Sequence, residues 1–188
     1  MPAIRTGPPT AEPWTLAEVK AHLKVDHAEE DALIGALLTG ARENAEERLG
    51  RTLCTTPWRL TLDGFPSAIK LPMPRALAVQ SVKYLDGDGV ERTLNPADYL
   101  LDDVSEPGFV VPAYGKAWPA TQCRVNALVV EYAAGYGPAA TAIPMPVRQW
   151  VLLVVMELYR NRSLTSEVKA IPHDFAASLL DYYKIWSI

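Results

Sequence analysis

The spacing of apolar residues changes twice along this chain, and these changes limit the fold more than any other feature. Between Thr15 and Gly50 apolar residues recur at every third or fourth position, which is typical of a helix with one buried face. From Thr52 to about Gly135 they alternate with polar residues, as in a half-buried strand, and from Pro144 the helical spacing returns. The order predicts an α+β fold: a small helical bundle from N- and C-terminal helix pairs, with an antiparallel β insertion between them.

The boundaries follow from these changes. We expect an extended arm over residues 1–13, which is rich in proline and has no periodicity. The bundle is expected over residues 14–51 and 144–183, the β insertion over 52–137, and a C-terminal tail over 184–188, all within a single domain.

Two helices are predicted before the β insertion. Thr15 and Glu18 have the spacing of a capping box, so a short helix is expected to run to about Lys24. Asp26 and Glu29 repeat that spacing before a second helix. Its predicted core stripe is Leu33, Ile34, Leu37, Leu38, Ala41, Ala45 and Leu49, and Gly50 is expected to close it.

Charged residues of this second helix are interpreted as solvent-exposed. Arg42 and Glu46 are four positions apart, and Glu47 follows directly. Such pairs on a helix surface are usually solvated, so no function is assigned to them.

About five to seven short strands are expected in the β insertion. Trp58, Leu60 and Leu62 alternate with polar residues, and Val125–Tyr132 is another candidate strand. Asp86-Gly87-Asp88-Gly89 is predicted to be a hairpin turn, because Asp-Gly dipeptides supply the positive φ angles that tight turns need.

A third helix is expected from Pro144 to about Arg162, and a fourth from Pro172 or His173. The predicted core stripe of the third helix is Val147, Trp150, Val151, Val154, Val155 and Leu158. Its other side is also largely apolar, and the C-terminus ends in aromatic residues and isoleucine, which either pack on the domain or dock into a partner. We therefore expect a protein–protein interface made of Leu152, Leu153, Met156, Tyr159, Tyr182, Tyr183, Ile185, Trp186 and Ile188.

Charge and hydropathy argue against tight binding to DNA and against a membrane-spanning helix. The net charge is −4, and no Lys or Arg cluster is present, so tight binding to DNA phosphates is disfavoured. Residues 1–9 lack the apolar segment of a signal peptide, so we expect synthesis in the cytoplasm. The longest apolar run, residues 150–156, is far shorter than the roughly 20 residues of a transmembrane helix, so no membrane span is expected.

No catalytic residue, metal site or cofactor is predicted. His22, His27 and His173 have no second ligand at metal spacing, and Cys54 and Cys123 are expected to be reduced thiols. The acidic residues near the predicted turn lack the spacing and terminal Glu of an EF-hand; they are Asp86, Asp88, Asp102 and Asp103.

The alternatives to this interpretation are a binding module and a small hydrolase, and each makes its own demand on the structure. A binding module for a peptide or carbohydrate could use Trp58, Tyr84 and Trp118, provided that these rings cluster on one exposed face. A small hydrolase would need a deep pocket with a pair of carboxylates, and the sequence contains no motif for one.

Several segments, in their order along the chain, resemble the head–tail connector proteins of tailed bacteriophages, which also occur in gene transfer agents. These segments are Pro13-Trp14-Thr15-Leu16-Ala17-Glu18-Val19-Lys20-Ala21-His22-Leu23-Lys24, Glu30-Asp31-Ala32-Leu33-Ile34, Glu47-Arg48-Leu49-Gly50-Arg51, Val79-Gln80-Ser81-Val82-Lys83-Tyr84-Leu85-Asp86, Tyr132-Ala133-Ala134-Gly135-Tyr136-Gly137, Ile143-Pro144-Met145-Pro146-Val147-Arg148-Gln149 and Leu158-Tyr159-Arg160-Asn161-Arg162. The chain departs from the usual family pattern at Trp14 and Lys24.

The resemblance implies a structural virion protein and not an enzyme. It implies a ring of twelve copies at the head–tail interface, with the portal on one side and a tail or stopper protein on the other. DNA would pass through this ring without sequence-specific binding, and the acidic composition suits such a passage because it repels phosphate.

Overall fold

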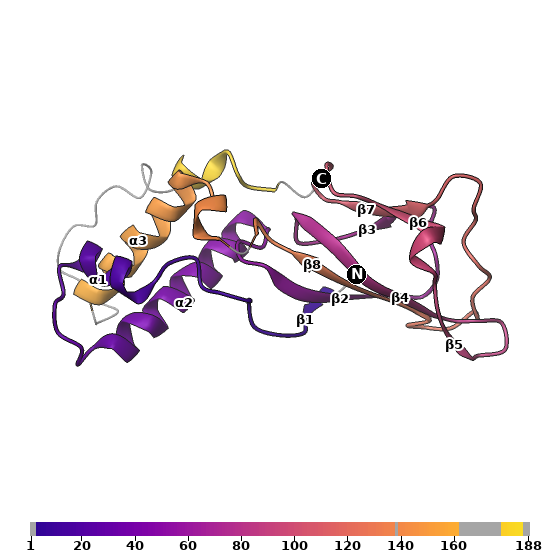
Figure 1. The fold of residues 1–188 in the computed structure, drawn as a ribbon, viewed down its shortest axis with the longest axis horizontal. Coiled ribbons are helices and arrows are strands. Elements are labelled where there is room, and N and C mark those ends of the chain that lie inside the picture. The colour runs from indigo at the N-terminus through magenta and orange to yellow at the C-terminus, as the bar shows by residue number, and fades with distance from the viewer. Residues whose placement is uncertain (1–2, 138, 162–177, 186–188) are drawn as a thin grey trace. The chain divides into compact units, whose positions relative to one another are not determined.

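The computed structural model describes residues 3–137, 139–161 and 178–185, and these fall into two compact units (Figure 1). The β unit comprises the described residues of Met1–Thr10 and Cys54–Gly137, and the helical unit those of Ala11–Leu53 and Pro138–Ile188. The predicted α+β fold is confirmed. Residues 3–10, expected to form a separate arm, belong to the β unit.

The helical unit contains α1 (Leu16–Leu23), α2 (Asp31–Leu49) and α3 (Met145–Arg160), which contact one another. A short 3-10 helix, η2 (Ala140–Ala142), precedes α3. Their shared core contains Val19, Ile34, Leu38, Ala41, Ala45, Leu49, Val147, Trp150, Val151 and Val155. The start of the expected fourth helix lies outside the described residues, and residues 178–181 are helical.

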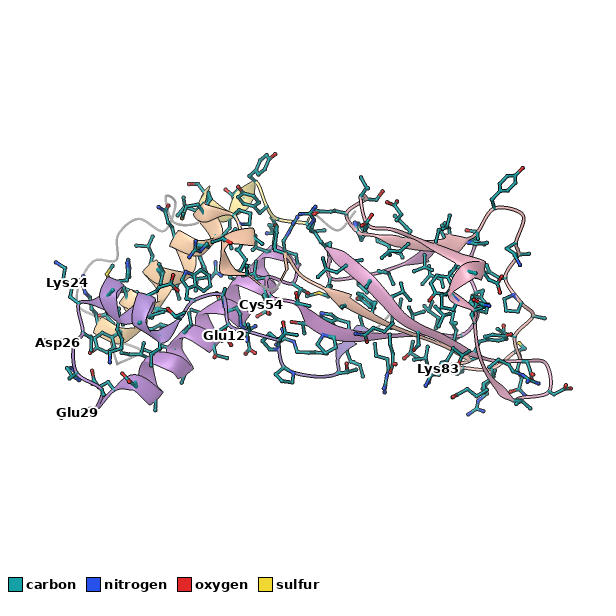
Figure 2. The ribbon with its side chains drawn as sticks, viewed as in Figure 1. Glu12, Lys24, Asp26, Glu29, Cys54 and Lys83 are labelled. Atoms are coloured by element: carbon teal, nitrogen blue, oxygen red, sulfur yellow. The ribbon has the colours of Figure 1, made fainter. Side chains whose placement is uncertain are left out.

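The ends of α1 and α2 show which sequence signals decide a helix boundary. The capping box of α1 is confirmed: the Thr15 amide donates to Glu18 Oε2 at 2.8 Å, and the Glu18 amide donates to Thr15 Oγ1 at 3.2 Å. The prediction of a second capping box is wrong, because the N-cap of α2 is Glu30, and the Glu30 side chain makes no capping hydrogen bond to this helix. Asp26 and Glu29 lie exposed in the connection from α1 (Figure 2), where the Asp31 amide donates to the Ala28 carbonyl.

The C-terminal end of α2 is as predicted. Gly50 has a φ of 64°, and its amide donates to the carbonyls of the last turn. This left-handed conformation is favourable for glycine and strained for residues with a side chain. The chain therefore turns sharply from α2 toward the β unit.

The β unit contains eight strands in two antiparallel sheets. The five-stranded sheet has the order β1-β2-β8-β4-β5, from β1 (Ala3–Arg5), β2 (Thr56–Leu62), β8 (Leu128–Ala134), β4 (Ala76–Leu85) and β5 (Glu91–Thr93). The three-stranded sheet has the order β3-β7-β6, from β3 (Ile69–Lys70), β7 (Phe109–Pro112) and β6 (Tyr99–Asp102). A 3-10 helix, η1 (Pro96–Asp98), precedes β6. Seven of these strands lie in the region where five to seven were predicted.

Alternation along β2 and β8 builds the core of the β unit. The two strands pair in register from Thr56 with Ala134 to Leu62 with Leu128. On each strand every second residue is buried, and the buried set includes Trp58, Leu60, Leu62, Leu128, Val130, Tyr132 and Ala134. Within this mostly apolar core the Tyr132 hydroxyl donates to the Pro72 carbonyl, and burial raises the pKa of Tyr132.

Two turns of the β unit depend on glycine. Gly89, with a φ of 79°, closes the predicted hairpin between β4 and β5, where the Asp86 amide donates to the Val90 carbonyl at 3.0 Å. Gly135 follows β8 with a φ of 143°, and a Cβ there would lie 2.6 Å from the backbone carbon of Cys54. No side chain can be accommodated at residue 135 without moving one of these two backbones.

Candidate assembly surfaces

The second face of α3 is half-buried in the helical unit. Leu152, Leu153, Met156 and Tyr159, predicted to form an interface, each have intermediate exposure. The Tyr159 hydroxyl donates to the carboxylate of Glu30. Leu158, predicted to lie in the core, is 42% exposed, so its assignment was wrong.

The C-terminal segment contributes one strongly exposed aromatic side chain. Tyr182 is 89% exposed, and its ring contacts that of the half-buried Tyr183 edge-on at 5.1 Å. Ile185 is held by its own unit, because its amide donates to the Leu49 carbonyl at 2.8 Å. Trp186 and Ile188 lie outside the described residues.

The N-terminal residues form an edge strand that the sequence did not predict. Ile4 of β1 lies opposite Arg59 of β2, and the Arg5 guanidinium lies 5.6 Å from the centre of the Trp58 ring. Beyond β1, the Thr6 amide donates to the Pro57 carbonyl, and the Thr10 amide donates to the Thr55 carbonyl. We call residues 3–10 the arm; in this structure it lies along the outer edge of β2.

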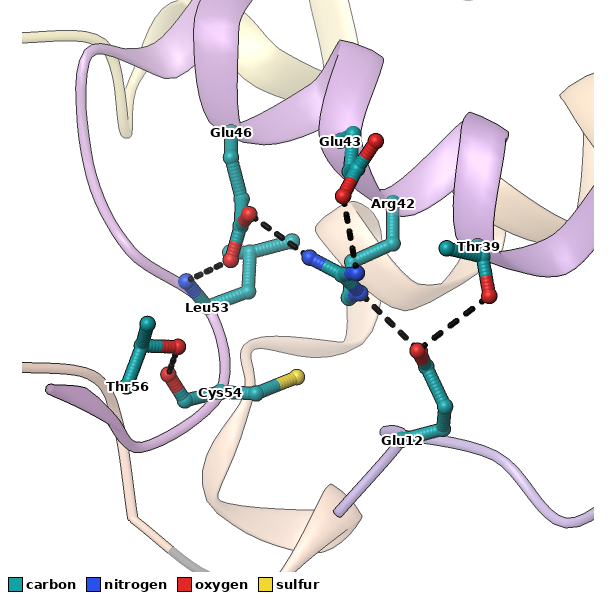
Figure 3. A network of polar contacts seen from close by, with 8 residues as sticks. All are labelled: Glu12, Thr39, Arg42, Glu43, Glu46, Leu53, Cys54 and Thr56. Carbon is teal, nitrogen blue, oxygen red and sulfur yellow. Dashed lines mark hydrogen bonds and ion pairs between the residues drawn. The ribbon is translucent and has the colours of Figure 1, made fainter. Parts of the chain in front are cut away.

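A buried network of charged side chains follows α2 (Figure 3). Arg42 is 1% exposed and Glu46 is 3% exposed, and the Arg42 Nη1 atom donates to Glu46 Oε2 at 2.8 Å. The interpretation of this pair as a solvated helix face was therefore wrong. The Arg42 Nε atom donates to Glu12 Oε2 at 2.9 Å, and the Arg42 Nη2 atom lies 3.4 Å from the half-exposed carboxylate of Glu43.

This network fixes two backbone segments onto one helix. Glu12 follows the arm by two positions, and Thr39 Oγ1 also donates to its carboxylate. The other oxygen of Glu46 accepts a hydrogen bond from the Leu53 amide at 2.9 Å, just before β2 begins. The segment between β1 and α1 and the segment between α2 and β2 are thus both held by side chains of α2 (Figure 3).

The aromatic residues considered for a binding module do not form one exposed face. Trp58 is 8% exposed and lies in the core of the β unit. Tyr84 and Trp118 instead contact Phe65, with ring centres 5.6 Å and 4.8 Å apart, and this group packs against the core as partly buried side chains. The position of Trp58 argues against the predicted three-residue site.

The described residues contain no group of three or more potential metal ligands. His22 and His27 are exposed, His173 lies outside the described residues, Cys54 is buried and Cys123 exposed. Asp86 and Asp102 stabilise turns: hydrogen bonds from Arg92 and the Val90 amide lower the pKa of Asp86. Hydrogen bonds from Ser105, and then from the Val104 amide, lower the pKa of Asp102.

The comparison with protein families supports the resemblance noted in the sequence. Residues 13–84 match the model of the family described as phage gp6-like head-tail connector protein. This segment contains α1, α2 and the strands from β2 to most of β4. No curated protein matches this chain in sequence.

Solved structures match the chain over its whole length. A chain from the virion of a native gene transfer agent particle has a TM-score of 0.82 at 22% identity, with 100% of this chain and 97% of that chain covered. A chain from the neck of an empty particle of this kind, computed with C6 symmetry, has a TM-score of 0.81 at 21% identity and the same coverage. A third, from the neck of a native particle computed with C12 symmetry, has a TM-score of 0.77 at 20% identity.

Among the described residues there is no helix with the length and apolar character that crossing a membrane requires. The predicted resemblance is confirmed: residues 13–84 carry the sequence pattern of phage gp6-like head–tail connectors, and the whole chain shares its fold with chains from gene transfer agent particles.

Proposed function

We propose that the whole chain acts as one connector domain, a structural, non-catalytic virion protein that forms a ring between the portal at the head vertex and a tail or stopper protein. The observation that carries the proposal is the match of residues 13–84 to a head–tail connector family, together with the whole-chain fold shared with neck proteins of gene transfer agents. The neck structures that resemble it have C6 and C12 symmetry, and a ring of twelve copies is consistent with both.

The chemistry of the chain agrees with this role. With a net charge of −4 it offers DNA phosphates little attraction, so a genome can pass through the ring without being retained. The side chains proposed to contact neighbouring proteins are the half-buried Leu152, Leu153, Met156, Tyr159, Tyr183 and Ile185, the exposed Tyr182, and Trp186 and Ile188 beyond them.

We expect the purified protein to be monomeric or weakly associated until it meets the portal. The exposed apolar residues of the described helical unit are few: Leu33, Met145, Leu158 and Tyr182. The exposed apolar surface of the described helical unit is too small to hold a stable ring by itself in dilute solution. A stable ring observed by light scattering without the portal would contradict this expectation.

The decisive experiment is negative-stain imaging of the chain mixed with the portal protein of the same particle. We expect rings seated on the portal. A Tyr182→Ser variant should bind less, because Tyr182 is the most exposed aromatic among the described residues of the predicted interface. Tyr114, which is also fully accessible but lies in the β unit, gives a matched control, Tyr114→Ser. Absence of any portal-bound ring with the unaltered chain would refute the proposed function.

A further inference from the structure

The outer edge of β2 is a pairing surface that the arm occupies in this structure. β2 pairs with β8 over seven positions on one side, and with β1 over three positions on the other. An uncovered strand edge presents unpaired amides and carbonyls, which can pair with another chain. The arm therefore controls whether this edge of the β unit is available.

The arm is held mainly by its pairing with β2 and contributes little apolar burial. Ile4 at the centre of β1 is 53% exposed, Ala3 is only partly buried against the core, and the Arg5 guanidinium lies over the Trp58 ring. Pro8 and Pro9 have no amide hydrogen to donate; beyond β1 the Thr6 amide donates to Pro57 of β2, and the Thr10 amide donates to Thr55, just before β2. A segment with so few buried contacts opens locally at a small fraction of the cost of global unfolding.

The residue that follows the arm by two positions is held much more firmly. Glu12 accepts a hydrogen bond from the buried Arg42 of α2. The arm can therefore leave β2 while its attachment to the helical unit stays in place. Nine extended residues before Glu12 reach about 30 Å, which is enough to contact an adjacent copy in a ring.

We propose that in the ring the arm of each copy leaves its own β2 and pairs with the β2 edge of the next copy. The inference rests on the proposed function, since it needs a ring. A cyclic ring requires a heterologous interface in which each copy presents two different surfaces. The arm and the β2 edge are such a pair, and their complementarity is shown by the pairing within one chain: Ala3 with Leu60, Ile4 with Arg59 and Arg5 with Trp58.

A reversible disulfide tests the exchange directly. Ile4 and Arg59 face each other across the β1–β2 pair, and both are exposed, so Ile4→Cys with Arg59→Cys can lock the arm onto its own chain. Cys123→Ser removes the exposed native thiol, while Cys54 is buried. With the portal, we expect rings from the reduced protein and none from the oxidised protein, and reduction should restore them. Equal ring formation by both forms would overturn the proposal.

A second reaction separates the failure of this inference from the failure of the proposed function. Chains with Ile4→Cys alone are mixed with chains carrying Arg59→Cys alone, both with Cys123→Ser, and oxidised in the same portal mixture. Disulfides between unlike chains, in excess over like pairs, support the exchange even if no ring is seen. Absence of that excess while rings form on the portal overturns the exchange alone; absence of both the excess and the rings overturns the proposed function as well.

Discussion

The two units stabilise their interiors in different ways. The β unit has a core of mostly apolar and aromatic side chains from facing strands, in which the Tyr132 hydroxyl donates to the Pro72 carbonyl. The helical unit packs its apolar stripes in the same manner, but also buries Arg42 and Glu46 on α2. A strand pattern of period two reveals a buried face directly, whereas a charged pair on a helix looks the same in the sequence whether it is exposed or buried.

The sharpest way to test this difference is to remove the buried cation. Arg42→Ala removes the buried guanidinium that bonds to the buried carboxylate of Glu46, and we expect the free energy of unfolding to fall by about 4 kcal/mol. Urea denaturation followed by circular dichroism measures it. Replacing both residues, as Arg42→Met with Glu46→Leu, should cost much less, because both buried charges are removed together.

Glu43→Ala is the matched control for the same network, since Glu43 contacts Arg42 from a half-exposed position. We expect it to change stability by less than about 1 kcal/mol. An effect as large as that of Arg42→Ala would show that the burial of Arg42 and Glu46 does not set their contribution.

The β unit should respond to lost volume instead of lost charge. Leu60 is fully buried between Trp58 and Leu62 on β2, and Leu60→Ala is expected to cost about 3 kcal/mol through lost burial and the cavity left behind. Thermal or urea unfolding monitored by tryptophan fluorescence gives the value. Thr61→Ala, on the opposite face of the strand, should cost well under half as much; equal costs would contradict the assigned register.

The smallest effect is expected at the start of α1. Thr15→Ala removes the N-cap and should cost about 1 kcal/mol. Hydrogen bonds from the Thr15 amide and hydroxyl lower the pKa of Glu18 from its ordinary 4.5. A carboxylate with a lowered pKa stabilises the fold above pH 4.5, and this contribution is lost as the pH falls through the lowered value. The difference between Thr15→Ala and the unaltered chain should therefore shrink in acid, and a constant difference would contradict the capping box.

Much of the fold was predictable because its signals are local. The capping box, the glycine that ends α2, the β4–β5 hairpin and the alternation on β2 each depend on residues close in sequence. The partners that sequence analysis missed are distant: Arg42 meets Glu12 thirty residues away, and β1 meets β2 more than fifty residues later. Nothing in residues 3–5 distinguishes an edge strand from a loose segment, since three residues are too few to show a period.

The exposure of the predicted interface also depends on contacts between residues that are distant in sequence. Leu152, Leu153 and Met156 form an apolar face, yet their intermediate exposure depends on what the rest of the chain places beside α3. Ile185 shows this dependence: its amide donates a hydrogen bond to the carbonyl of Leu49 at the end of α2, and no spacing rule indicates this contact.

Gly135 has a consequence for how such a chain can diverge over evolution. The solved chains that share this fold are only about a fifth identical to it in sequence, so the fold can be formed by very different sequences. At residue 135, however, even a methyl group would collide with the backbone of Cys54. We expect glycine to be retained at this position unless the backbone around Cys54 changes as well. Residue 135 should therefore help to align sequences that share the fold but little else.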